Sequence, residues 1–275
     1  MISLIAEYGF LQNAIIGTLL ASIACGLLGT IIVEKKLVMM SGGIAHTAFG
    51  GIGLGYFLNI EPIYTALGFS VFSALSIACI QRRSGVINDV LIGMFWPLGM
   101  ALGIVFVSLT PGYPPDMTSY LFGDILTITK TDLIIMGGLD LILIITVTGI
   151  FKLLQAYLFD EEFSTALGLP VVLAETLTYI MIAITVIVLI RVVGIILVLA
   201  LLCVPPALAR LFKPNLAVIM GLAIVLSAFF CLAGLGLSYE YNIASGAAIV
   251  IFSVFVYAVF QLLRYLRSLF FRSNF

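Results

Sequence analysis

The sequence predicts an all-α fold, a polytopic integral membrane bundle of about nine transmembrane helices that forms a single domain over residues 1–275. Two observations support this prediction: the apolar composition of the chain and its apolar stretches of membrane-spanning length. The chain is 63% hydrophobic and only 9% charged, and its mean hydropathy is +1.29. A water-soluble core does not need so many apolar residues, whereas several membrane spans do. Nothing in the composition supports binding of nucleic acid, and the formal net charge is only -1.

Nine apolar stretches are long enough to cross a hydrocarbon core, which takes about 20 helical residues. The weakest boundary lies at Arg191, and a single broken span there would reduce the count to eight. The nine stretches are Phe10–Val33, Leu37–Leu58, Ile63–Ile80, Val86–Leu109, Leu133–Leu154, Leu173–Ile190, Val192–Leu211, Leu216–Leu237 and Ile243–Leu266.

The basic residues indicate the orientation of these spans. With nine spans, ten of the twelve Lys and Arg residues fall in alternate connections and the C-terminal tail, and only Lys130 and Arg191 fall on the other side. The positive-inside rule then places the N-terminus outside and the C-terminus in the cytoplasm. Residues 1–10 contain no Lys or Arg, so we expect the first span to be its own insertion signal and not part of a cleaved signal peptide.

The only histidine, His46, lies within the uncharged, glycine-rich part of Lys36–Asn59. A helix that begins near Lys36 places His46 about 15 Å deep, close to the midplane of a core about 30 Å thick. Two interpretations are open: a packed small-residue seam with a hydrogen-bonded His46, or a translocation path with room beside the imidazole. The residues that share its helical face are Met39, Gly42, Gly43, Gly50 and Gly53.

The predicted outer connection, Thr110–Thr131, cannot be one continuous helix because it holds three prolines and two glycines. Its apolar segments YLF and ILTI predict that it folds back into the bundle. We interpret Asp116 as a solvated loop carboxylate. Asp124 has two open interpretations: it lies in the translocation path near the outer mouth, or it caps a short helix.

The predicted inner connection, Tyr157–Pro170, reads as a short amphipathic cytoplasmic helix. Acidic residues favour a helix N-terminus, and glycine followed by proline marks an end. The acids are Asp160, Glu161 and Glu162, the end is at Gly168 and Pro170, and the apolar stripe is Phe159, Phe163, Ala166 and Leu167. The stripe either packs onto the inner ends of its own spans or docks a soluble partner.

Pro205 and Pro206 fall inside a predicted span. Their rings remove backbone donors and kink a helix, which would leave the carbonyls near Leu201 and Leu202 free to point into a cavity of the translocation path. Such kinks are common in transporters and also in packed membrane helices.

Motifs for catalysis or tight metal binding are absent from the sequence. The cysteines Cys25, Cys79, Cys203 and Cys231 each lie alone in apolar runs, which favours buried structural thiols. There is no HExxH, no nucleophile elbow with a triad partner and no GxxxxGK[ST] phosphate loop. We therefore expect the chain not to be an enzyme, and any ATP must be bound by another chain.

Two long motifs resemble the permease subunits of ABC importers for zinc, manganese and iron. FDEEFSTALGLP from Phe159 is similar to a cytoplasmic segment of that family, and VVGIILVLALLCVPPALARL from Val192 is similar to its VVGxLLVxALLxxPAATARL pattern. Weaker matches begin at Asn88, Tyr120 and Gly234, so the resemblance covers nearly the whole chain.

The chain departs from this family around the histidine. The family pattern GDAxSHAxLPG becomes SGGIAHTAFG in Ser41–Gly50, which keeps His46 and has Gly42 where the family has an acid. The family commonly has a small hydroxyl residue where this chain has Asp124. The resemblance implies His46 as a metal ligand, and one carboxylate lost and another gained would be a compensating exchange that makes Asp124 the candidate second ligand.

The resemblance implies an assembly of two copies of the chain, two cytoplasmic ABC ATPase subunits and an external solute-binding protein in the cell membrane. The transported substrate would be a divalent metal ion, ATP would be used by the partner, and no cofactor would be bound permanently. The segment 157–170 would couple the chain to the ATPase. The alternatives are a permease for a metal chelate or other small nutrient and an ATP-independent channel or ion-coupled carrier. The low intramembrane charge count disfavours the last.

Overall fold

The computed structural model describes residues 9–84, 88–111, 123, 125–212 and 215–272. Within these ranges the regular elements are helices, and no strand occurs. They are α2 (Gly9–Glu34), α3 (Val38–Leu58), α4 (Pro62–Ser84), α5 (Asn88–Leu109), the 3-10 turn η1 (Ile125–Thr127), α7 (Lys130–Gly149), α8 (Phe151–Phe159), α9 (Glu161–Ala166), α10 (Val171–Val193), α11 (Ile195–Arg210), α12 (Leu216–Tyr241) and α13 (Ser245–Arg272).

The predicted all-helical membrane fold is confirmed, and each of the nine apolar stretches overlaps a helix. In the part of the chain described, seven helices are long and apolar enough to cross a membrane. The other two are α3, whose glycines and His46 lower its hydropathy, and α11, which has only 16 residues. The count of nine crossings is therefore not confirmed.

The boundaries within two predicted stretches differ from expectation. The tract around Arg191 breaks at Gly194, whose φ of +80° is a left-handed value suited to glycine, so α10 and α11 are separate helices. The stretch Leu133–Leu154 is divided between α7 and α8, which meet at Ile150. Helix ends depend on local hydrogen bonding, which hydropathy does not report.

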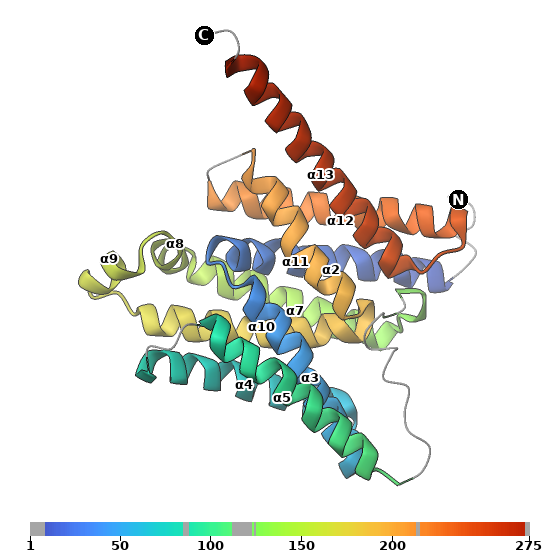
Figure 1. Cartoon of the computed structure of the whole chain (residues 1–275). Coiled ribbons are helices and arrows are strands. Elements are labelled where there is room, and N and C mark those ends of the chain that lie inside the picture. The colour runs from blue at the N-terminus through green and yellow to red at the C-terminus, as the bar shows by residue number, and fades with distance from the viewer. Residues whose placement is uncertain (1–8, 85–87, 112–122, 124, 213–214, 273–275) are drawn as a thin grey trace.

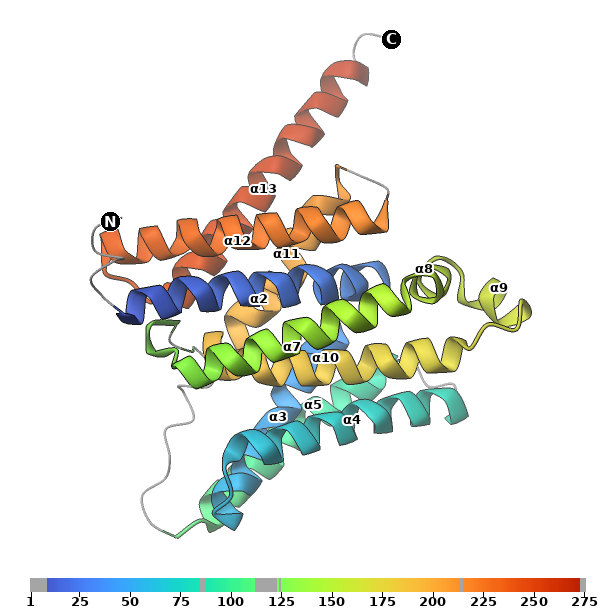
Figure 2. The ribbon, with the colours of Figure 1, turned by 180° about the vertical axis from the view of Figure 1, so that it is seen from behind.

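Two sets of helices cross one another in the bundle. Helices α2, α4, α7, α10 and α12 run roughly alongside one another, while α3, α5, α11 and α13 cross them obliquely (Figures 1 and 2). Helix α2 packs against α7, α11 and α12, and α3 packs between α4 and α5. Helix α13 leaves the bundle toward its C-terminal end. The bundle therefore has α2 at its centre and the His46 helix, α3, among the crossing helices.

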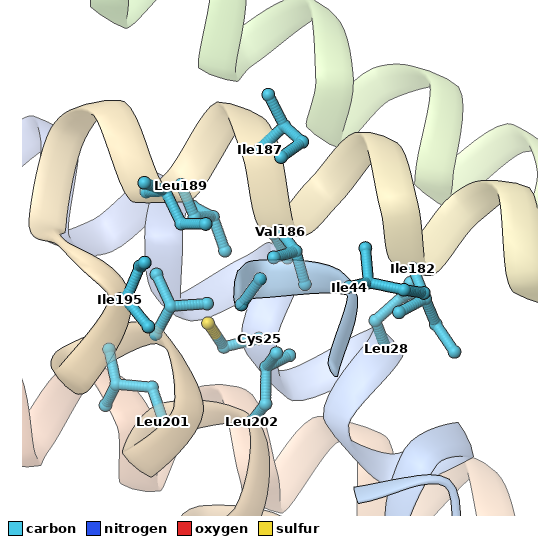
Figure 3. Close-up of a cluster of buried hydrophobic side chains, with 14 of the residues drawn as sticks. Cys25, Leu28, Ile44, Ile182, Val186, Ile187, Leu189, Ile195, Leu201 and Leu202 are labelled. Atoms are coloured by element: carbon cyan, nitrogen blue, oxygen red, sulfur yellow. The ribbon is translucent and has the colours of Figure 1, made fainter. Parts of the chain in front are cut away.

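The core around α2 depends on close approach of helix backbones. A Cβ added to Gly26 would lie 2.7 Å from the Cα of Ile224 in α12. Cys25 and Leu28 of the same helix meet Val186 of α10 and Leu202 of α11 in the cluster shown in Figure 3. Small residues at such contacts let helix backbones approach closely. This packing matters in a membrane, because lipid is as apolar as the helices and the hydrophobic effect does not drive their association.

The polar residues at one end of the bundle are paired. Arg191, one of the two basic residues expected outside, lies 2.9 Å from Asp132 and 3.5 Å from Glu61. Asp132 also forms a capping box with Thr129 at the start of α7. These contacts join the ends of α10 and α7 to the start of α4.

The expectation of four buried cysteines is wrong at Cys79, which is exposed on α4. Cys25 and Cys231 are buried and Cys203 is intermediate. Apolar neighbours in sequence do not show which side of a helix is buried in the bundle, and Cys79 lies on the exposed side of α4.

Candidate functional site

His46 lies near the middle of α3 and stacks on Trp96 of α5. The two ring centroids are 4.2 Å apart and the planes differ by 11°. Phe49, one turn further along α3, lies 6.5 Å away at an angle of 18°. Trp96 is the only tryptophan in the chain, so the two residues form a unique pair at the crossing of α3 and α5.

The Nδ1 atom of His46 is buried and has no hydrogen-bond partner among the described residues. This differs from the interpretation in which the histidine is hydrogen-bonded within the bundle. A buried polar atom without a partner costs about 1–3 kcal/mol, so each such atom calls for an explanation. An imidazole nitrogen with a free lone pair can accept a proton or bind a metal ion.

The glycines beside His46 form a packed seam in this conformation. A Cβ added to Gly43 would lie 2.5 Å from Ile92, and one at Gly50 would lie 3.0 Å from the Gly99 carbonyl. Gly53 meets the backbone of Gly103 at 2.5 Å in the same way. These positions bring α3 against α5 and leave no room for a solute here, so their place in a translocation path stays a prediction.

Gly42 is different from the other glycines on this face. The atoms nearest to an added Cβ belong to Trp96 at 3.8 Å and Leu199 at 3.9 Å, which is ordinary van der Waals distance. The position lies four residues, about one turn, before His46. A Cβ at position 42 would therefore fit one turn before the imidazole without a close contact.

The two prolines of α11 lie away from His46, against α2. Pro205 and Pro206 are buried, and α11 is helical on both sides of them. The carbonyl oxygen of Leu202 faces Gly29, where an added Cβ would lie 2.5 Å from it. The expected opening of this carbonyl into a cavity is therefore wrong in this conformation, because α2 packs against this part of α11.

The predicted fold-back of the outer connection is confirmed for its last residues. Ile125 and Ile128 are buried in the main core, and Asn13 of α2 donates a hydrogen bond of 3.1 Å to the Ile128 carbonyl. Asp116 and Asp124 lie outside the described residues. The pairing of Asp124 with His46 therefore stays a prediction.

Asp140 is a buried acid that the sequence analysis missed. It lies within α7, and its Oδ2 atom has no hydrogen-bond partner in the described part of the chain. The sequence could have identified Asp140 as a candidate functional residue, because an acid within an apolar run of spanning length is unusual. The stacking of Trp96 on His46 had no such signal, because it depends on how α3 crosses α5.

The predicted coupling segment consists of two helices. Helix α8 ends at Phe159, and α9 has only six residues. Asp160 caps α9 by accepting a hydrogen bond of 2.9 Å from the Phe163 backbone amide, and Gly168 has a left-handed φ of +75°. The start of the helix at the acids and its end at Gly168 were predicted correctly. The break at Asp160 was not predicted, and it places Phe159 on α8 and not on α9.

The apolar stripe of this segment is not packed against its own spans. Phe159 is 94% exposed, Phe163 62% and Leu167 61%, and Ala166 is exposed as well. The segment is instead anchored by the buried residues Ser164 and Tyr157. Of the two interpretations of the stripe, internal packing is wrong for this chain.

Grooves flank this segment on two sides. One of about 680 Å³ is lined by Phe159, Arg210 and Phe212, and it runs from α8 to the ends of α11 and α12. Another of about 570 Å³ is lined by Arg82, Glu161 and the start of α10. Exposed aromatic residues between charged grooves are typical of a surface that binds another protein.

The apolar helices and these two sites define the class of the chain as a multi-pass protein of the cell membrane. The chain belongs to the ABC 3 transport family, whose model matches residues 7–264. It is 42% identical over 253 residues to an uncharacterized membrane protein of Synechocystis sp., covering 92% of this chain and 90% of the relative.

One further relative is named as a transport protein, and another similar protein has a solved structure. The manganese transport system membrane protein MntC of Halalkalibacterium halodurans is 30% identical over 253 residues, covering 92% of this chain and 87% of that protein. The structure of PsaBC from Streptococcus pneumoniae in complex with Fab matches with a TM-score of 0.83 at 28% identity, covering 94% of this chain and 93% of that one.

The stacked pair makes tryptophan emission a probe of His46. We expect the emission to fall when acid protonates the imidazole, because an imidazolium against the indole face is a cation–π contact that alters the excited state. The measurement is a fluorescence titration of the purified protein in detergent. The His46→Gln variant should lack the step, and identical curves for the two proteins would contradict the stacking.

Proposed function

We propose that the chain is the membrane permease subunit of an ATP-driven importer of divalent metal ions. The structural observation that carries the proposal is the imidazole of His46 within the helical bundle, whose buried Nδ1 has no hydrogen-bond partner among the described residues. The names of relatives that match about nine tenths of the chain, such as MntC, favour manganese among zinc, manganese and iron. Imidazole is a ligand for all of these metals.

The metal site in this proposal is incomplete, as suits a carrier. In the described residues no group of three or more His, Cys, Asp or Glu side chains could hold a metal ion. His46 supplies one nitrogen, and Asp124 would supply a carboxylate if the outer connection brings it near. A site with few ligands releases its ion readily, whereas a structural site with four does not.

The closed state of the site is consistent with alternating access. The Nδ1 atom is buried and the glycine seam is packed, while His46 as a whole is partly exposed, so in this proposal a metal ion would meet the Nδ1 atom in another conformation. Docking and release of an ATPase at the far end of the bundle would drive the change between states. The proposed path contains Gly42, Gly43, Gly50, Pro205 and Pro206 besides His46.

The proposed orientation has the N-terminus outside and the C-terminus in the cytoplasm, with α3 and α11 completing nine crossings. It is supported by the basic residues Lys35, Arg82 and Arg210, which lie at the end of the bundle that carries α8 and α9. The proposed assembly contains two copies of this single permease domain, two ATPase subunits and an external solute-binding protein. The exposed stripe on α8 and α9 would be the ATPase contact.

The metal-ligand role of His46 predicts a specific transport defect. We expect His46→Gln to insert and assemble normally, while uptake of Mn²⁺ falls by about tenfold or more, since even outer partners of a metal ligand are worth that much. The measurement is uptake by vesicles that contain the whole assembly. Gly137→Ala, at a position with open space beside it, is the control. Wild-type uptake and selectivity in His46→Gln would falsify the ligand role.

The space at Gly42 predicts a gain of function. Gly42→Asp should fold, because only ordinary contacts surround the site, and should place a carboxylate one turn from His46. We expect Mn²⁺ to bind about tenfold tighter, a change of about 1.4 kcal/mol from one anionic ligand. Titration of Trp96 emission with Mn²⁺ measures it. Gly42→Asn is the neutral control, and equal affinity of the two variants would argue against metal at this position.

The exposed stripe predicts a docking defect. We expect Leu167→Glu to leave the permease folded but to reduce co-purification of the ATPase, because an anchor at an interface is worth about 2 kcal/mol or more. Glu162→Gln should have a smaller effect, since exposed charges contribute little. Full recovery of the ATPase with the Leu167→Glu protein would show that the stripe does not bind it.

A further inference from the structure

A single ammonium group connects the coupling segment to the helix that precedes α3. The Nζ atom of Lys35, directly after α2, donates hydrogen bonds of 2.7 Å to Glu161 Oε2 in α9 and 3.1 Å to the Tyr157 carbonyl in α8. The same atom lies 3.9 Å from the centroid of the Tyr157 ring. Three contacts from two helices therefore converge on one side chain.

These contacts differ from an ordinary surface ion pair, which holds two mobile side chains together weakly. Lys35 is only 18% exposed, and Tyr157 is among the largest fully buried side chains. The buried ring fixes the position of the ammonium, which in turn fixes Glu161. Desolvation of the lysine strengthens both the hydrogen bonds and the cation–π contact.

The turn that contains Lys35 is short and stiff. Lys36 has a left-handed φ of +60°, and the buried Leu37 donates a hydrogen bond of 2.8 Å to the Ile32 carbonyl. Helix α3 begins at the next residue, Val38, and His46 lies eight residues further, about 12 Å along the axis. Because the turn is short, a displacement of Lys35 also displaces the start of α3.

Among the ion pairs of the described residues, Lys35–Glu161 is the one that reaches α9. Arg82 bonds Glu175, Thr176 and the Val172 carbonyl, and so joins α4 to α10. Arg210 pairs with Glu34 and joins α11 to α2. The remaining pairs of Arg191 lie at the opposite end of the bundle.

We infer that Lys35 is a positioning residue that transmits movement of α8 and α9 to α3, and so to His46, through its contacts with Glu161 and Tyr157. The inference rests on the proposed function, in which an ATPase docks on α8 and α9. Movement of the docked segment pulls the α2–α3 turn, and α3 shifts against α5 at the glycine seam. The proposal concerns the efficiency of coupling and not the docking itself.

The test uses the whole assembly in vesicles and measures Mn²⁺ taken up and ATP hydrolysed in the same sample. We expect Lys35→Met to co-purify with the ATPase at wild-type yield and to hydrolyse ATP, while the Mn²⁺ moved per ATP falls at least about fivefold. Methionine keeps the apolar length of the lysine but removes the charge. The matched control is Lys152→Met, which removes an exposed lysine from α8.

A charge exchange keeps the test decisive if Lys35→Met fails to fold. We expect Lys35→Glu and Glu161→Lys each to lower the Mn²⁺ moved per ATP, and the double exchange to recover only the part that depends on the ion pair, because a carboxylate at position 35 cannot replace the contacts with Tyr157. Wild-type coupling in Lys35→Met, or no recovery in the double exchange, overturns the inference. A wild-type chain that neither binds the ATPase nor imports Mn²⁺ overturns the proposed function instead.

Discussion

Close contact between helix backbones at glycines is the constraint on which this structure depends. Lipid is as apolar as leucine, so membrane helices associate through tight packing and not through burial of apolar surface. The missing side chain at Gly26 lets α12 lie directly against α2. At Gly29 it lets the Leu202 carbonyl of α11 lie against the same helix. Gly53 does the same for α5 on α3. Removing the space at such a position would force two helices apart, and everything they carry would move with them.

The same packing explains why His46 is well placed to respond to movement. Its helix is held to α5 by a seam of small residues, by the stacked rings of His46 and Trp96 and by the contact of Phe57 with Phe106. Such a seam can slide at lower cost than a contact of large, interdigitated residues. The buried Nδ1 atom, which has no partner among the described residues, is a local cost in this conformation, and contact with water or another hydrogen-bond partner would remove that cost.

Charged residues at the two ends of the bundle join the helices that run alongside one another. Arg191 joins α10 to α7 and α4 at one end, and Arg82 and Lys35 join α4, α10, α2 and the coupling segment at the other. Between them the described part of the chain is nearly free of charge, apart from the buried Asp140. In this arrangement no ion pair of the described residues constrains the middle of the bundle, whereas ion pairs join the helix ends, including the proposed partner contact on α8 and α9.

The sequence by itself determined the helical class, the apolar stretches, the start and the end of α9, and the place of His46 within a helix, because each depends on residues close together in the chain. Hydropathy, helical period and the conformational preferences of Asp160 and Gly168 are local properties. Only the tertiary structure decided that His46 stacks on Trp96, that Leu202 faces Gly29 and that Lys35 reaches Glu161. These contacts depend on how helices cross, and the crossing is fixed by packing between residues that are distant in sequence.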